Sequence, residues 1–343
     1  MKQDPAKFTI VPIRLQDCDR GDHRLSTFQQ FDYFSDPEGC LDELAVQFGG
    51  TSLSDPSNKD ERTETEKIIE SLLGKAEVAD YVGDYEKALT LCSAILEIKP
   101  DYAEPWHNKG IVLGQLNRLE EALAAFEQAT QINPNLAEAW YNKGIALHQL
   151  KRPEEALPAF ERAIQINPNY AEAWYNKGVV LGNLNRPKEA LAAYEQAIQI
   201  NPNFAKVWYN KGVVLSDLNR PEEALAAYER AIQINPNKAK AWYGKGFALG
   251  ELNRPEESTA AFERAIQIKP DYADAWYNKG VVLGQLKRPE EELVAYERAI
   301  QIKPDYANAW YNKGIVLRQL NRPEESKSAF ARANEINPHL KQS

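Results

Sequence analysis

AEAWYNKGVVLGNLNRPKEALAAYEQAIQINPNF, residues 171–204, decides the architecture of this 343-residue chain. The stretch nearly overlays itself when it is shifted by 34 residues in either direction. All the tryptophans follow that period: Trp106, Trp140, Trp174, Trp208, Trp242, Trp276 and Trp310. Repetition at a fixed period of about 20–50 residues is typical of a solenoid built from stacked units.

Each repeat begins with a stretch that predicts an amphipathic helix. Trp174, Gly178 and Leu181 stand at i, i+4 and i+7, so they share one helical face. A glycine inside a helix costs roughly 1 kcal/mol. We therefore expect a second helix to approach closely at Gly178.

A turn and a second helix complete the repeat. Pro187 suits the first position of a helix, where no amide partner is lost. Glutamates follow in most repeats, and their negative charge suits a helix N-terminus. Ala190, Tyr194 and Ala197 alternate small and large on the face that meets the tryptophan face. Pro202 ends the helix, since proline disfavours helix in the residue before it.

These six landmarks give the chain its family resemblance. The tetratricopeptide repeat (TPR) signature has the same residue types at the offsets of Trp174, Gly178, Ala190, Tyr194, Ala197 and Pro202. The resemblance covers residues 63–340 and implies an all-α, right-handed superhelical solenoid of helix-turn-helix repeats. We expect eight repeats, the first degenerate and the last a cap: 69–102, 103–136, 137–170, 171–204, 205–238, 239–272, 273–306 and 307–340.

Three local features depart from the repeat pattern. The residue before the first-helix glycine is Lys in seven repeats, Lys109 to Lys313, where the TPR family usually has Leu. We interpret this lysine as a device for stacking or solubility. Pro158 inside a second helix predicts a bend. Lys327 and Asn334 make the last helix polar, as in a capping repeat, so we expect a natural C-terminus and a truncated N-terminus.

The N-terminal 50 residues do not follow the 34-residue repeat pattern. FTIVPIRL (8–15) and FQQFDYF (28–34) predict short strands, and Leu41, Leu44 and Phe48 follow at helical spacing. This α/β segment, 1–50, resembles the C-terminal end of a bacterial TIR domain. The catalytic glutamate of NAD-cleaving TIR domains lies upstream of that point, so no residue here is assigned a TIR role. The alternative is a small α/β cap on the first repeat. Residues 51–62 continue a Gly-, Ser- and Pro-rich run and predict a linker.

Composition narrows the classes of protein. The chain carries a net charge of −9, and its isoelectric point is about 5.2, which disfavours binding to nucleic acid. A mean hydropathy of −0.57 with no long apolar run gives no reason to expect a membrane partner. Cys18, Cys40 and Cys92 lack the spacing of a disulfide framework. We expect a cytoplasmic protein.

The sequence holds no pattern of an enzyme. The histidines, His23, His107, His148 and His339, form no metal-ligand spacing, and no nucleophile or phosphate-loop motif is present. Pairs of carboxylates recur at the start of the second helix in nearly every repeat, whereas the residues of a catalytic site would occur once in the chain. We therefore expect no catalysis, no metal and no cofactor.

Binding is the alternative, and the helical wheel indicates a surface for it. The residues one and two after each tryptophan face away from the tryptophan stripe. They are Tyr in six repeats (Tyr141, Tyr175, Tyr209, Tyr243, Tyr277 and Tyr311) and Asn in six (Asn108, Asn142, Asn176, Asn210, Asn278 and Asn312). Asparagine can donate to and accept from any peptide bond. These positions predict a groove for a protein or an extended peptide, as in the asparagine ladder of the O-GlcNAc transferase family. The alternative is that Tyr and Asn bond adjacent helices together.

Variation among the repeats indicates where selectivity resides. The position two before Trp turns basic in the middle, at Lys206 and Lys240, and Phe247 replaces Val or Ile. We predict that these residues, with Tyr243, bind a ligand that has an acidic group beside an apolar one. The alternative is that Asp217 and Glu251 neutralise the lysines. TPR proteins that bind heat-shock chaperone tails hold the tail's carboxylate with a Lys one residue after the tryptophan position and an Arg two residues after it. This chain has Tyr or His at the first position and Asn or Gly at the second, so heat-shock chaperone tails are not expected partners.

Three functions follow from these patterns. The first is a protein- or peptide-binding scaffold. The second is the regulatory arm of a TIR-type NAD-consuming enzyme whose catalytic half is absent from this chain. The third is a structural array that self-associates end to end.

Overall fold

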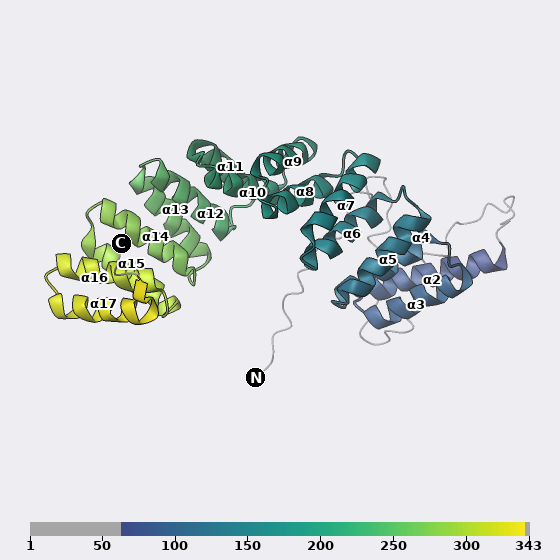
Figure 1. The fold of residues 1–343 in the computed structure, drawn as a ribbon, viewed down its shortest axis with the longest axis horizontal. Coiled ribbons are helices and arrows are strands. Elements are labelled where there is room, and N and C mark those ends of the chain that lie inside the picture. Colours follow the sequence, from purple (N-terminus) through teal and green to yellow (C-terminus); the bar gives the residue numbers. More distant parts are fainter. Residues whose placement is uncertain (1–62, 340–343) are drawn as a thin grey trace, which may run out of the picture. The chain divides into compact units, whose positions relative to one another are not determined.

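In the computed structural model, residues 63–339 are described, and they fold into helices without any strand. The all-α solenoid predicted from the repeats is therefore confirmed. The strands expected within residues 1–50, the linker and the TIR resemblance lie outside the described residues. Figure 1 shows the helices following one another as antiparallel pairs.

Each pair has a first helix, A, and a second helix, B. The A helices are α2 (Glu64–Tyr81), α4 (Ala103–Gln115), α6 (Ala137–Gln149), α8 (Ala171–Asn183), α10 (Ala205–Asp217), α12 (Ala239–Glu251), α14 (Ala273–Gln285) and α16 (Ala307–Gln319). The B helices are α3 (Tyr85–Ile98), α5 (Leu119–Ile132), α7 (Pro153–Ile166), α9 (Pro187–Ile200), α11 (Pro221–Ile234), α13 (Pro255–Ile268), α15 (Pro289–Ile302) and α17 (Pro323–Ile336).

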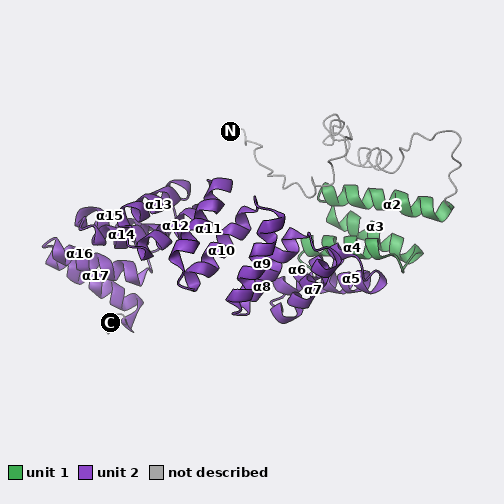
Figure 2. Ribbon diagram, turned by 90° about the horizontal axis from the view of Figure 1, so that it is seen from above, with its two compact units in different colours: residues 1–118 green, residues 119–343 purple. Residues whose placement is uncertain are grey.

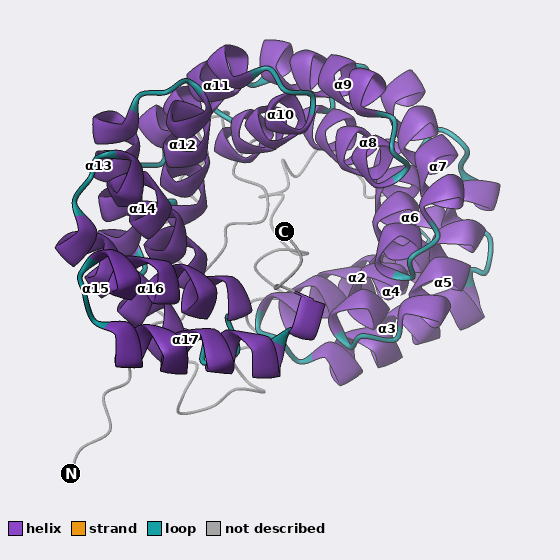
Figure 3. Ribbon diagram, turned by 60° about the vertical axis from the view of Figure 1, so that its left-hand side comes forward, coloured by secondary structure: helices purple, strands orange, loops and turns teal. Residues whose placement is uncertain are grey.

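The chain divides into two compact units, residues 1–118 and 119–343 (Figure 2). In the described part of unit 1, α2 packs on α3 and α3 on α4. Unit 2 holds α5 to α17, where each A helix packs on its own B helix and each B helix packs on the next A helix. Within unit 2, Figure 3 shows α8, α10, α12 and α14 along the inner side, with α9, α11 and α13 outside them.

The core of each pair follows the predicted small-and-large alternation. Ala190 and Ala197 are fully buried, and the Tyr194 ring between them is 2% exposed. That ring lies against Gly178, where an added Cβ would stand 2.6 Å from Tyr194 Cδ1. The close approach expected at the helix A glycine is therefore present.

The turn between A and B carries a Schellman cap. In α8 the amide of Arg186 donates to the carbonyl of Leu181 (2.9 Å), and Asn185 N donates to Gly182 O (3.0 Å). Asn185 adopts a φ of 57°, the left-handed region that asparagine tolerates better than most residues. Arg186 then forms a forked ion pair with Glu189 in the first turn of α9 (2.7 Å for each bond). The glutamate two residues after the proline thus binds the arginine that precedes the proline.

Two of the sequence irregularities lie on described helices. Helix α7 runs through Pro158 without interruption, and Pro158 is exposed there. In α17, Lys327 is exposed, and Asn334 Oδ1 is buried without a hydrogen-bond partner among residues 63–339. The bend at Pro158 and the capping role of α17 stay predictions.

Candidate binding surface

The tyrosines and asparagines of the A helices meet between neighbouring repeats. In four repeats the amide Nδ2 of the asparagine donates to the hydroxyl of the tyrosine one repeat earlier. Four such bonds, of 2.9–3.3 Å, are Asn176 to Tyr141, Asn210 to Tyr175, Asn278 to Tyr243 and Asn312 to Tyr277. Both residue types are half-buried along the seam. The donor side of the asparagine ladder is thus used to join repeats, as the scaffold alternative requires.

The Oδ1 atoms of the same asparagines, unlike their Nδ2 atoms, have no partner in the described chain. Asn176 Nδ2 also donates to the carbonyl of Glu172 (2.9 Å), and Asn278 Nδ2 does so to that of Asp274 (3.0 Å). The Oδ1 atoms of Asn176, Asn210, Asn278 and Asn312 accept no hydrogen bond from residues 63–339, and they are not among the buried unpaired atoms there. Each is therefore an acceptor that is not fully buried and has no partner in the described chain.

The tyrosine rings stack on an aromatic residue that the sequence reasoning missed. It stands immediately before the next A helix, 29 residues further along the chain. The pairs are Tyr141–Tyr170, Tyr175–Phe204, Tyr243–Tyr272 and Tyr277–Tyr306, with ring centroids 4.8–5.2 Å apart. Burial raises the pKa of Tyr141 to about 12, so its phenol is neutral at physiological pH. The recurrence of an aromatic residue immediately before the A helices is visible in the sequence and could have predicted these ring pairs.

The remaining predicted site residues lie at different depths. Asn108 and Asn142 are half-buried, and Tyr311 packs edge-on against Phe330 at 5.3 Å. Phe247 is 43% exposed, whereas the Val or Ile at its position in other repeats is half-buried. Lys206 and Lys240 are exposed, and within residues 63–339 neither forms an ion pair with Asp217, Glu251 or another carboxylate. The neutralising contact considered from the sequence is thus not formed.

The lysine before the helix A glycine joins consecutive repeats. Its ammonium group lies over the ring of its own repeat's tryptophan, 5.4–5.8 Å from the centroid in unit 2. It also pairs with a glutamate on the preceding B helix, 16 residues earlier, at 2.8–3.1 Å: Lys143–Glu127, Lys177–Glu161, Lys211–Glu195, Lys245–Glu229, Lys279–Glu263 and Lys313–Glu297. This contact fits the interpretation of the lysine as a stacking device and assigns it a partner.

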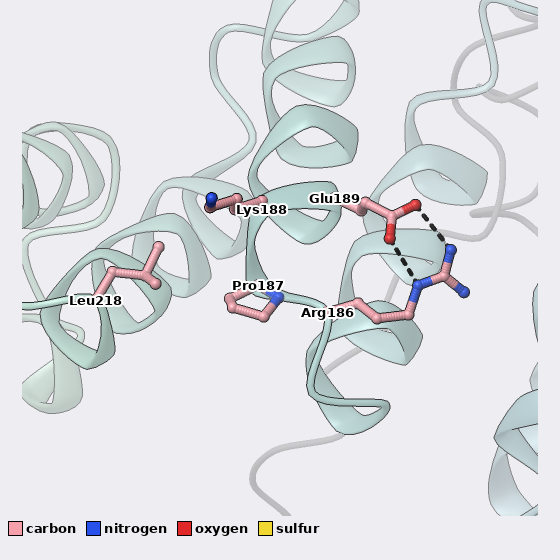
Figure 4. A pocket seen from close by; sticks show the side chains of 5 residues that line it. All are labelled: Arg186, Pro187, Lys188, Glu189 and Leu218. Atoms are coloured by element: carbon pink, nitrogen blue, oxygen red, sulfur yellow. Dashed lines mark hydrogen bonds and ion pairs between the residues drawn. The ribbon is translucent and has the colours of Figure 1, made fainter.

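Other kinds of site find little support in the described part of the chain. A depression at the start of α9 is lined by Arg186, Pro187, Lys188, Glu189 and Leu218 (Figure 4). Its polar contact is the Arg186–Glu189 pair, which recurs at five other A–B turns, so the depression is a feature of the repeat. Residues 63–339 hold no group of three or more His, Cys, Asp and Glu arranged to bind a metal ion. None of the helices there combines the length and apolar character needed to cross a bilayer.

Comparison with known families agrees with this geometry. Sequence models described as "Tetratricopeptide repeat" match residues 137–170, 171–204, 205–238, 243–307 and 295–327, and one described as "TPR repeat" matches 113–151. The chain is a tetratricopeptide repeat protein. Proteins of this family are interaction scaffolds that bind protein or peptide partners, and the TPR fold is generally non-catalytic.

Solved structures of other TPR proteins share the fold. PilF of Pseudomonas aeruginosa matches with a TM-score of 0.53 at 19% identity, covering 60% of this chain and 93% of its own. A TPR protein from Parabacteroides merdae matches with a TM-score of 0.53 at 16% identity, covering 78% of this chain and 99% of its own. YrrB, described as a TPR protein with an unusual peptide-binding site, has 27% identity and a TM-score of 0.49 over 55% of this chain and 97% of its own. A search of curated proteins found no match.

Proposed function

We propose that this protein binds an extended peptide segment of a partner protein along the A-helix face of its repeats. The observation that carries the proposal is the row of asparagine Oδ1 atoms that have no partner in the described residues and are not fully buried. Each has the same place in its repeat, so together they present acceptors at a regular interval, apart from repeat 239–272, which has Gly244 at this position. An extended peptide presents backbone N–H donors at a regular interval as well.

The bonds on the other side of each amide support this function. In Asn176 the Nδ2 atom is held by Tyr141 Oη and by the carbonyl of Glu172, which fixes the direction of Oδ1. A side chain that is already ordered loses little conformational entropy when a ligand binds. The inter-repeat bond and the binding role are therefore compatible, because each uses a different atom of the amide.

Apolar surface lies beside this row of acceptors. Val179, Val213 and Val281 follow the asparagines by one turn and are half-buried, as are the tyrosine rings. Rigid rings and aliphatic groups beside hydrogen-bonding groups are a common composition of recognition surfaces. The amides supply contacts that tolerate any peptide sequence, and these side chains supply contacts that depend on it.

The test compares two double variants that break the same pair of inter-repeat bonds. Asn176→Ala with Asn210→Ala removes the Oδ1 acceptors, whereas Tyr141→Phe with Tyr175→Phe breaks the bonds and keeps the acceptors. The probes are peptides selected from a displayed random library on the full chain, and their affinities are measured by fluorescence anisotropy. We expect about tenfold weaker binding for the alanine pair and a change of less than about threefold for the phenylalanine pair.

Each other outcome has a definite meaning. Equal losses in the two double variants would show that the asparagines act through stability alone. Unchanged affinity in both would place the binding surface elsewhere. Gln199→Lys, an exposed change on the outer helix α9, is the control for nonspecific effects and should leave binding unaltered.

A further inference from the structure

The regular seam of tyrosine and asparagine is interrupted at one place among the described A helices that follow α8. At Tyr209 in α10 both partners that the other tyrosines have are replaced. The stacking aromatic is replaced by Lys238, 29 residues further on, and the amide donor is replaced by Gly244, 35 residues further on. The two replacements fall in the same repeat and affect the same tyrosine.

The missing stack leaves one side of the Tyr209 ring without an aromatic neighbour. Tyr141, Tyr175, Tyr243 and Tyr277 each pair with a ring at 4.8–5.2 Å. The aromatic partner of Tyr209 in the described chain is Tyr228 of its own repeat, at 6.0 Å. Lys238 is exposed and makes no cation–π contact with Tyr209.

The missing donor leaves the Tyr209 hydroxyl without a hydrogen-bond partner in residues 63–339, and the hydroxyl is not fully buried. Gly244 accounts for this, because it lacks the side-chain amide of asparagine. A Cβ at Gly244 would lie 2.6 Å from the Tyr228 ring, so the glycine lets Tyr228 pack against the helix backbone. Tyr228 Oη contacts Ser216 Oγ at 3.4 Å instead of a neighbouring amide.

Apolar and cationic groups lie around this position. Lys240, Tyr243 and Phe247 follow one another at i, i+3 and i+7 on α12, so they share the face that includes Gly244. Phe247 is 43% exposed. Lys206 precedes Tyr209 by three residues on α10, hence on the same face. Lys206, Lys238 and Lys240 are exposed and lack carboxylate partners in the described chain, although the whole protein has a net charge of −9.

We call this set the Tyr209 gap: Lys206, Tyr209, Lys238, Lys240, Gly244 and Phe247. We propose that the Tyr209 gap is a specificity pocket for an aromatic side chain of the bound peptide, flanked in that peptide by carboxylates. The inference rests on the peptide-binding function proposed above. An aromatic ring from a ligand would take the position that Tyr170, Phe204, Tyr272 and Tyr306 occupy elsewhere on the seam.

Charge and ring chemistry select the occupant. Stacked or edge-on aromatic pairs gain energy beyond the area that they bury, so a ring is favoured over an aliphatic side chain at Tyr209. Three unpaired ammonium groups attract carboxylates and disfavour a basic peptide. The remaining surface of an acidic protein repels an acidic peptide, which directs the carboxylates to these lysines.

The experiment uses three dye-labelled synthetic peptides and the full chain. The first peptide has an Asp-Glu-Phe-Asp-Glu centre in Gly-Ser flanks, the second has Ala for Phe, and the third has Lys for each acidic residue. Fluorescence anisotropy gives the affinity of each. We expect the first to bind about tenfold more tightly than the second, and the third to show no binding at the same protein concentrations.

The variants restore the regular seam or reverse the charge. Lys238→Tyr supplies the missing ring, and we expect it to weaken binding of the first peptide more than Lys238→Ala does. Gly244→Asn supplies the missing amide and should weaken it further. Because that change crowds Tyr228, the conclusion rests on Lys238→Tyr if Gly244→Asn fails to fold. Lys206→Glu with Lys240→Glu should abolish binding, whereas the charge-matched control, Lys151→Glu with Lys287→Glu at exposed turns, should preserve most of it.

The outcomes separate this inference from the proposed function. Equal affinity for the first and second peptides, or equal affinity of the wild type and Lys238→Tyr, would overturn the Tyr209 gap as an aromatic pocket. If the library-selected peptides still depended on Asn176 and Asn210, peptide binding itself would stand. If they did not depend on them while the first peptide still required Lys206 and Lys240, the pocket would stand without the asparagine row.

Discussion

Two glycines in helix α8 should respond in opposite ways to the same substitution. A Cβ added to Gly178 would lie 2.6 Å from Tyr194 Cδ1, whereas nothing lies within 4 Å of a Cβ added to Gly182. Both positions are inside the helix, so both alanines gain about 1 kcal/mol of helix propensity. The two variants therefore differ only in what the methyl group meets.

The packing term sets the sign at Gly178. The Tyr194 ring is 2% exposed and is held between buried alanines, so it has no room to swing away. Inserting a methyl group into a well-packed core typically costs about 1–3 kcal/mol, and an overlap of this size belongs at the upper end. After the propensity gain, we expect Gly178→Ala to lower the free energy of unfolding by about 2 kcal/mol. Gly182→Ala should raise it by roughly 0.5–1 kcal/mol.

The measurement is urea unfolding of the full chain, followed by circular dichroism, with hydrogen exchange of the α8 and α9 amides. The second readout is needed because repeat arrays unfold locally and a single free energy then describes them poorly. Loss of amide protection should centre on α8 and α9 in Gly178→Ala. The reasoning is refuted if Gly178→Ala stabilises the protein as Gly182→Ala does.

Two further predictions concern positions where one repeat departs from the others. Glu292 is buried where five other repeats have a fully buried Ala, and burial raises the pKa of its carboxyl. A raised pKa in the folded state means that stability is present at low pH and is lost as the pH rises, so Glu292→Ala should stabilise by on the order of 1 kcal/mol at pH 7. That gain should shrink as the pH approaches the unfolded value of about 4.3, and urea midpoints at the two pH values check it. Lys287 adopts a φ of 55° at a turn position held by Asn in five other repeats, so Lys287→Asn should stabilise by roughly 0.5 kcal/mol; a lower thermal midpoint for the variant would contradict the argument.

Much of the fold was predictable because the same constraints occur many times. A glycine tolerated inside a helix indicated the close approach of a second helix, and Asn-Arg-Pro indicated where α9, α11, α13 and α17 begin. Thr63 begins the first helix with a capping box to Glu66, where the helical pattern of the sequence starts. Residues at equivalent positions of the repeats could be interpreted together, because each of these positions has the same structural environment in every repeat.

The candidate surface was less predictable from the sequence. A helical wheel shows on which side of a helix a side chain lies, but it does not show which residue of another helix that side chain contacts. It placed Tyr and Asn on the face away from the tryptophans, but it could not show that Asn210 reaches back 35 residues to Tyr175. The partner of Lys177, Glu161, lies on another helix and was invisible for the same reason. Contacts between repeats depend on the angle at which helices stack, which single-helix periodicity does not contain.

The contact in which a lysine lies over its own tryptophan and pairs with a glutamate of the preceding B helix has a consequence for the evolution of the chain. Because the Lys177–Glu161 and Lys211–Glu195 contacts have the same spacing and geometry, the surfaces on the two sides of any 34-residue block in unit 2 are interchangeable. Unequal recombination in the gene can then delete or duplicate a block and still leave matching interfaces. Loss of the 34-residue block 238–271 would remove Lys238, Lys240, Gly244 and Phe247 and bring Tyr272 and Asn278 to the positions 29 and 35 residues after Tyr209. A single recombination event would then close the gap and leave a continuous array.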